Sequence, residues 1–216
     1  KRDWSSDVCS SDLVGIIKGG VEVQAIEGHG TTAELLLDQT PFYAESGGQV
    51  GDIGTVTSTT GAARVLDTYS PVRGVIVHRI EIEFGKLVVG EPIDARVDEE
   101  RRRRVAANHT GTHILHAALR DILGTHVKQA GSLVTPERLR FDYTHFAALT
   151  DREIQEIESR INDVVFRNLP VQTNVMDLNA AVASGALAFF GEKYAQERSE
   201  EHTSELQSRF GISYAV

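Results

Sequence analysis

The sequence contains very little cysteine, and this limits how its fold can be stabilised. Cys9 is the one cysteine among 216 residues, so no internal disulfide can form. A chain without disulfides fits a reducing compartment, and we expect a cytoplasmic protein.

Long apolar runs are also absent. No stretch approaches the roughly 18 consecutive apolar residues that a membrane-spanning helix requires. The N-terminal region lacks the continuous apolar core of a signal peptide. We therefore expect no membrane partner. Apolar residues make up 41% of the chain and charged residues 25%, which is typical of a globular protein of one or two domains.

Basic residues are fewer than acidic ones. The chain has 22 Lys and Arg against 31 Asp and Glu, a net charge of −9. Proteins that bind nucleic acid through its phosphates usually have a basic surface, so DNA is not an expected partner. The exception is the run Arg101–Arg104. It can contact a phosphate backbone, or form a solvated helical turn paired with the acidic residues 98–100, and both interpretations stay open.

The two ends of the chain differ from the rest. Residues 1–13 and 198–216 are rich in Ser and charged residues and show no apolar period. Both resemble translated sequencing-adapter read-through, and we expect them to be artefactual and disordered. The remaining sequence then divides into a domain at 14–98 and a second domain at 99–197.

Residues 14–98 have the pattern of an all-β domain. Short apolar or alternating runs are separated by Gly-rich and polar breaks, which favours a small β-barrel or a sandwich. The expected strands are 21–26, 33–37, 63–66, 74–78 and 93–97.

One break between these strands is unusually long and rich in glycine. It covers residues 40–54, TPFYAESGGQVGDIG. Glycine allows positive φ and a close approach of the backbone to a ligand, so this loop is a candidate binding element. The alternative is a loop with a structural role only. Gly47, Gly48 and Gln49 lie at its centre.

The strongest candidate for chemistry is a pair of histidines on a predicted helix at 99–124. His109 and His113 are four residues apart, and a helix places residues at that spacing on one face. Two imidazoles on one face can bind one metal ion, although a catalytic zinc typically takes three protein ligands. The alternative is that both histidines are simply packed or solvated. His116 could also take part, but its position suits a residue of the helix face.

Strands and helices alternate after this helix, which gives an α+β domain at 99–197. The pattern predicts strands at 126–134 and 139–143, then a helix that opens with a capping box of Thr150 and Glu153. A strand at 171–175 and a short Ala-rich helix from Asp177 to Gly185 follow.

Several motifs in one order resemble the editing region of alanyl-tRNA synthetases. They are TPFYAESGGQVGDIG (40–54), NHTGTHILHAALRDILGTHVKQAGS (108–132), LRFDYTH (139–145), RNLPVQTNVMDL (167–178) and FGEKY (190–194). The resemblance covers about residues 14–197. It implies a small β-barrel followed by an α/β editing module of the kind shared by threonyl- and alanyl-tRNA synthetases.

The resemblance also implies a reaction and a partner. The family hydrolyses the ester that joins serine or glycine wrongly to alanine tRNA. The resemblance assigns His109 and His113 as two of four zinc ligands, and Gln129 as a residue of the editing pocket. Gln129 is our candidate catalytic residue, with an exposed strand position as the alternative. Further substrate or tRNA contacts are expected from the glycine-rich loop (Gly47, Gly48, Gln49) and from Thr110 and Thr112, between the ligands.

The sequence departs from the family pattern in two respects. The family supplies the other two zinc ligands from a Cys-x-x-x-His motif, and none follows Tyr194 here. The aminoacylation domain that binds ATP would precede residue 14 and is also absent. We therefore expect a fragment of an alanine–tRNA ligase with half of the zinc site, inactive as written. A tRNA-docking module without catalysis and a free-standing alanyl-tRNA editing hydrolase are the alternatives.

Overall fold

The computed structural model describes residues 7–169, 173–175, 186–187, 205–207 and 213–214. It groups the chain into two compact units. The first comprises residues 1–109 and 132–140, and the second comprises residues 110–131 and 141–216. This grouping differs from a boundary at residue 98, because the first half of the histidine helix belongs with the strands of the first unit.

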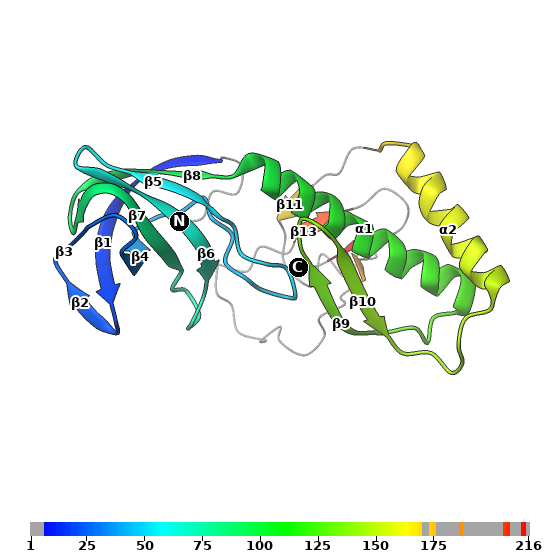
Figure 1. Ribbon diagram of the computed structural model, residues 1–216. Coiled ribbons are helices and arrows are strands. Elements are labelled where there is room, and N and C mark those ends of the chain that lie inside the picture. Colours follow the sequence, from blue (N-terminus) through cyan, green and yellow to red (C-terminus); the bar gives the residue numbers. More distant parts are fainter. Residues whose placement is uncertain (1–6, 170–172, 176–185, 188–204, 208–212, 215–216) are drawn as a thin grey trace. The chain divides into compact units, whose positions relative to one another are not determined.

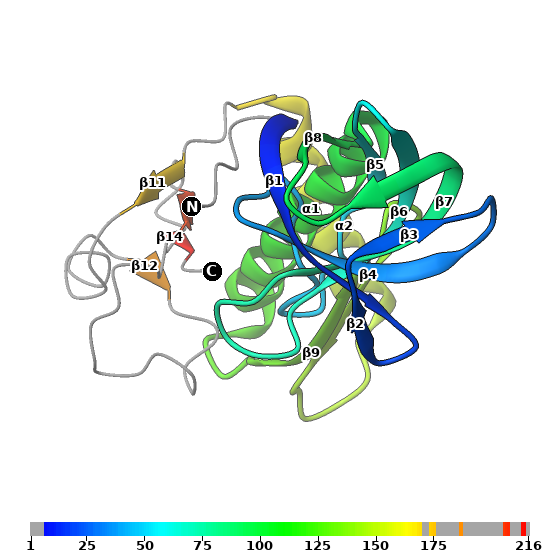
Figure 2. The ribbon, with the colours of Figure 1, turned by 90° about the vertical axis from the view of Figure 1, so that its left-hand side faces the viewer.

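A closed antiparallel barrel forms most of the first unit (Figure 1). Its strands are hydrogen-bonded in the order β1-β4-β7-β6-β5-β8, and β8 pairs back with β1 to close the ring. Figure 2 shows how these strands curve around one another. Their bounds are β1 (Val8–Lys18), β4 (Thr32–Leu37), β5 (Gly54–Thr57), β6 (Gly61–Tyr69), β7 (Val77–Val88) and β8 (Pro92–Val97). Two short strands, β2 (Val21–Val23) and β3 (Ala25–Glu27), pair with β1 and β7. The predicted barrel is confirmed.

The barrel strands follow the alternation that a half-buried sheet requires. In β8, Ile93, Ala95 and Val97 are buried and the residues between them are exposed. Side chains of successive strand residues point to opposite faces, so these three enter the barrel interior. One apolar cluster fills it: Leu13, Ile16, Ile26, Ala33, Leu35, Phe42, Val56, Ala63, Val65, Ile80, Ile82, Leu87, Ile93, Ala95 and Val97.

The prediction of a disordered head is wrong for residues 8–13. Residues Val8–Asp12 pair with β8, and Leu13 is fully buried in the barrel core. Backbone hydrogen bonds make this pairing, so it does not need the apolar period that the segment lacks. Whether residues 1–13 are artefactual in origin stays a prediction.

A buried histidine ties the barrel to the start of the glycine-rich loop. His78 of β7 is fully buried, and its Nε2 lies 2.8 Å from the Thr40 hydroxyl. Its Nδ1 lies 3.2 Å from the Leu35 carbonyl, and its ring meets Phe42 edge-on at 5.3 Å. A carbonyl only accepts, so Nδ1 donates to Leu35 and Nε2 accepts from Thr40. Burial lowers the pKa of His78 to about 4.

The long helix α1 (Glu99–Leu123) follows the barrel, and α2 (Asp151–Phe166) follows a hairpin of β9 (Gln129–Val134) and β10 (Leu139–Tyr143). These elements confirm the predicted helices and strands within a few residues. Gly124 has φ +113° directly after α1, as expected for a helix C-terminus. The capping box is confirmed, since Thr150 accepts from the Glu153 backbone and Glu153 accepts from that of Thr150.

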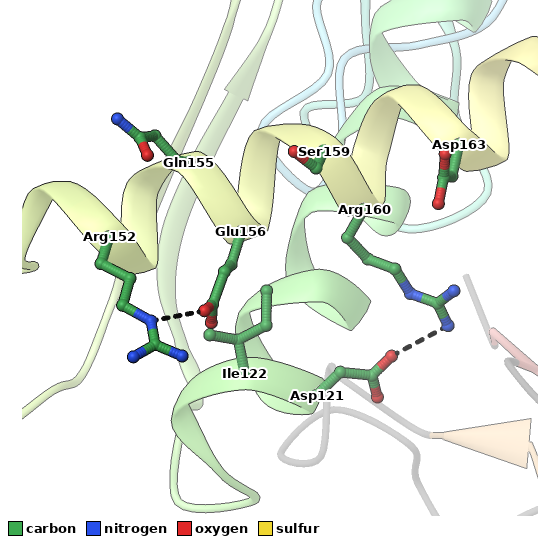
Figure 3. A pocket seen from close by; sticks show the side chains of 8 residues that line it. All are labelled: Asp121, Ile122, Arg152, Gln155, Glu156, Ser159, Arg160 and Asp163. Carbon is green, nitrogen blue, oxygen red and sulfur yellow. Dashed lines mark hydrogen bonds and ion pairs between the residues drawn. The ribbon is translucent and has the colours of Figure 1, made fainter.

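The second unit has a smaller apolar cluster. Its buried members among the described residues are Ala118, Leu119, Val127, Phe141 and Ile157. The surface groove between α1 and α2 is lined mostly by charged and polar residues, and it holds two ion pairs, Arg160–Asp121 at 3.2 Å and Arg152–Glu156 at 2.8 Å (Figure 3). No helix in the described part of the chain is long and apolar enough to cross a membrane.

Four short strands complete the described residues. They are β11 (Thr173–Val175), β12 (Ala186–Leu187), β13 (Glu205–Gln207) and β14 (Ser213–Tyr214). β11 pairs with β13, and β12 pairs with β14. β13 and β14 lie in the tail that was expected to be disordered. The predicted helix from Asp177 to Gly185 and the FGEKY motif lie outside the described residues.

Candidate functional site

The helix α1 carries both candidate metal ligands. In a helix, residues four positions apart lie on the same face. His109 and His113 have this spacing within α1. His109 is half-buried and His113 is only 8% exposed. Since α1 is continuous from Glu99 to Leu123, the predicted i, i+4 relation of the two histidines holds.

The first unit places His109 against the glycine-rich loop. The Gln49 side-chain oxygen lies 2.7 Å from His109 Nδ1, although 60 residues separate them in the sequence. Burial lowers the pKa of His109 below its usual value. A neutral imidazole, the form that binds metal ions, is therefore favoured at neutral pH.

Hydrogen bonds to the backbone carbonyls of Gly47 and Gly48 hold the loop beside residues 132–134. The Val134 amide donates to the Gly48 carbonyl at 2.8 Å, and the Ser132 hydroxyl donates to the Gly47 carbonyl at 3.1 Å. Gly48 has φ +85°, and a Cβ there would lie 2.3 Å from the Ser132 carbonyl oxygen. Any larger residue would push the loop away from this segment. The structure thus gives Gly47 and Gly48 a positional role within the first unit.

Two arginines at the start of α1 fix the other end of the loop. Arg102 forms an ion pair with Asp52, whose side chain is 4% exposed, and Arg101 donates to the Gly51 carbonyl at 2.8 Å. Asp52 also accepts from the Tyr43 amide at 2.7 Å. The alternative in which the Arg run pairs with acidic residues 98–100 therefore holds only in part. Arg104 does pair with Glu100, at 2.8 Å.

The second unit contains the remaining candidates. Thr112 and His113 are buried, and Thr110 and Gln129 are half-buried, with Gln129 the first residue of β9. Gln129 is thus a strand residue that is half-buried and not exposed. His116 is 2% exposed and contacts the Phe141 ring at 4.9 Å. Burial lowers the pKa of His116 to about 4, which suits a packed residue of the helix face.

His109 and His113 are the described residues that could bind zinc. His109 presents a neutral imidazole held by an amide oxygen at Nδ1, the arrangement found around zinc-binding histidines. The described residues do not include a group of three or more His, Cys, Asp or Glu positioned to hold a metal ion. The part of the chain that the structure describes therefore fits one half of a zinc site.

The contacts of Arg101 and Arg102 with the loop could not be read from the sequence. An Arg run at a helix start is compatible with solvent, phosphate or a carboxylate, and Asp52 is separated from it by 50 residues.

The chain is similar to known proteins over most of its length. Residues 3–101 match the family model described as tRNA synthetases class II (A). An alanine–tRNA ligase of Pseudothermotoga lettingae is 53% identical over 165 residues, which cover 76% of this chain and 19% of that ligase. The ligase of Fervidobacterium nodosum is 50% identical over 187 residues (87% and 22%), and that of Sinorhizobium medicae is 48% identical over 194 residues (90% and 22%). The chain thus spans about a fifth of the length of the curated relatives it matches.

Proposed function

Because the chain is a segment of the alanyl-tRNA synthetase family, we propose that it carries the editing region of such a ligase. The proposed reaction is hydrolysis of the ester that joins serine or glycine to alanine tRNA. The single observation that carries the proposal is the HxxxH pair on α1, with the Nδ1 of His109 bonded to Gln49 of the glycine-rich loop. Attachment of alanine to tRNA with ATP is proposed for the whole ligase only.

His109 and His113 are the residues that would hold zinc. When bound, zinc can lower the pKa of a water to about 7 or polarise the ester carbonyl. Burial favours neutral His109, so it does not need to lose a proton before it binds a metal ion near pH 7. Cys-x-x-x-His ligands, as in the family pattern, would complete the set in a full-length ligase.

Gln129 is proposed as the polar group that recognises the aminoacyl part of the substrate. Its amide can bond a serine hydroxyl, or the end of the tRNA. An alanine ester would leave that amide unpaired, so this contact selects serine over alanine and does not account for glycine. Thr110 and Thr112 offer hydroxyls from the turn between the two proposed zinc ligands, and Gly47 and Gly48 offer backbone groups.

A second candidate function is docking on tRNA without catalysis. The observation that favours it is the absence of a three-ligand metal group among the described residues. This candidate is consistent with a chain whose described residues supply only the histidine pair as zinc ligands. The editing activity is then a property of the ligase in which the other ligands are present.

The test is deacylation of Ser-tRNA(Ala) by the full-length ligase that contains this segment. We expect His109→Ala, His113→Ala and Gln129→Ala to slow hydrolysis by at least 10-fold, while alanine attachment continues. His29→Ala is the matched control, because His29 lies on the barrel and is exposed. Equal hydrolysis by all of these variants would overturn the proposal.

Zinc binding by the 216-residue chain distinguishes the two candidates. Weak binding by the chain supports docking without catalysis. Tight binding at one zinc per chain, lost on His109→Ala, would show that the chain completes a site and would justify an activity assay on the chain itself.

A further inference from the structure

A side-chain contact within the first unit decides which nitrogen of His109 can bind a metal ion. The Gln49 amide oxygen lies 2.7 Å from Nδ1 of His109. An amide oxygen only accepts hydrogen bonds, so Nδ1 must carry the proton. In a neutral imidazole the other nitrogen, Nε2, is then the one with the lone pair. We propose that Gln49 is a positioning residue, which fixes the tautomer and the ring orientation of His109 so that Nε2 is the metal-binding atom.

This inference rests on the proposed zinc site and gives Gln49 a different role from the substrate contact expected from the sequence. A ligand histidine commonly donates its second ring nitrogen to an oxygen, and such outer partners set the ligand's direction and basicity. Gln49 supplies that oxygen without a charge. The half-buried position of both residues limits competition from water.

The backbone around Gln49 is held on both sides. Ser46 and Gln49 exchange two backbone hydrogen bonds, at 3.0 and 3.2 Å, and close a tight turn over Gly47 and Gly48. The next amide, of Val50, donates to the Val134 carbonyl at 3.1 Å. These bonds use main-chain groups only. The Gln49 side chain therefore remains available for His109 while its backbone cannot shift.

The same helix that carries His109 also anchors the loop. Arg101 and Arg102 lie two turns before His109 on α1, and they bind Gly51 and Asp52 near the end of the loop. Asp52 in turn accepts from the Tyr43 amide, near the start of the loop. Loop and helix therefore form one hydrogen-bonded assembly within the first unit. It fixes the distance between Gln49 and His109 from both sides.

The tautomer can be measured without any metal. Histidine labelled with ¹⁵N in the full 216-residue chain reports on each ring nitrogen at about pH 8, above the ordinary imidazole pKa of about 6.5. We expect His109 to carry its proton on Nδ1. Gln49→Ala should move the proton largely to Nε2, and Gln49→Glu, which keeps an acceptor, should retain it on Nδ1. Gln24→Ala is the control, since Gln24 is exposed on the barrel.

A zinc titration of the same samples supplies the second measurement. Following the His109 signals, we expect Gln49→Ala to weaken apparent zinc affinity by about 10- to 100-fold, while the Gln49→Glu and Gln24→Ala variants stay near the parent chain. Circular dichroism and thermal unfolding check that each variant is folded.

Two results would overturn the inference. One is a proton on Nε2 of His109 in the parent chain, and the other is a Gln49→Ala variant with unchanged tautomer and zinc affinity. Neither result touches the proposed editing function, which is tested by hydrolysis of Ser-tRNA(Ala) in the His109→Ala ligase. The failure of one proposal is thus distinguishable from the failure of the other.

Discussion

The two compact units bury their side chains in different ways. Among the described residues, the barrel cluster has fifteen buried apolar members, and the cluster around α1 and α2 has five, with several half-buried neighbours. The first unit also contains a buried histidine in β7 and a buried carboxylate in the glycine-rich loop, each with its partners. The glycine-rich loop and His109 are thus attached to the more completely packed unit. The proposed metal ligand His109 therefore belongs to the unit with the larger buried cluster.

The largest expected effect comes from opening a cavity in the barrel. Leu35 is fully buried, and Leu35→Ala should lower the free energy of unfolding by about 4 kcal/mol, since a leucine truncated in a closed core leaves a cavity. Ile157→Ala, in the second unit, should cost only about 2 kcal/mol, because its surroundings are less enclosed. Urea unfolding measures both. Equal costs would contradict the proposed difference in packing, and exposed Val21→Ala is the neutral control.

The ion pair under the glycine-rich loop should have the next largest effect. Arg102→Ala leaves Asp52 as a buried carboxylate without its main cation, at a cost of about 3 kcal/mol. Arg103→Ala, next to it on α1, removes an exposed arginine and should change stability by less than about 0.5 kcal/mol. Thermal unfolding of the two variants compares the positions. A similar Tm for both would mean that the Asp52–Arg102 pair does not stabilise the barrel.

Acid should weaken the barrel through His78. Its pKa is lowered to about 4 in the folded chain from 6.5, so the unfolded chain binds a proton first as the pH falls. This contribution is fully present above pH 6.5 and is lost between pH 6.5 and pH 4. At pH 5 the loss is about 2 kcal/mol.

Unfolding free energies at about pH 7 and pH 5 test this linkage. His78→Gln should be less stable than the parent chain at neutral pH, but its loss on acidification should be smaller by about 2 kcal/mol. The informative quantity is the change in unfolding free energy between pH 7 and pH 5, and not the unfolding free energy at either pH. If His78→Gln lost as much unfolding free energy on acidification as the parent chain, a neutral, buried His78 would be contradicted.

The smallest effect is expected at the start of α2. Thr150→Ala removes the side chain that accepts from the Glu153 backbone and should cost about 1 kcal/mol. Ser159→Ala is the control, because Ser159 is exposed in the middle of the same helix and alanine favours helix. Hydrogen exchange of the first-turn amides of α2 reports the change locally. Protection that stays the same in Thr150→Ala would argue against the capping box.

Elements with strong local signals were predictable from the sequence. The α2 start follows from Thr150 and Glu153, whose side chains act within one turn of the helix. β8 follows from a strict alternation of apolar and polar residues. β1 was not among the expected strands, and its first half, Val8–Asp12, is held by backbone pairing with β8 and carries mostly polar side chains. β5 was missed because it is short and directly follows the glycine-rich loop.

The candidate residues of the site could be named from the sequence, but the contacts between them could not. The i, i+4 spacing of His109 and His113 is a property of one helix and can be read from the sequence. The contact of Gln49 with His109 joins segments 60 residues apart, and it exists only because the barrel brings the loop to the helix. The same holds for Arg102 and Asp52. Such long-range pairs leave no periodic signal.

The closure of the barrel by β1 has a practical consequence for anyone who shortens the chain. β1 pairs with both β4 and β8, so removing residues 1–13 would leave most of β8 without a neighbour on one side. An open strand edge with free amides and carbonyls recruits strands from other molecules. A chain trimmed to residue 14 should therefore be prone to aggregate, whatever the origin of its first residues.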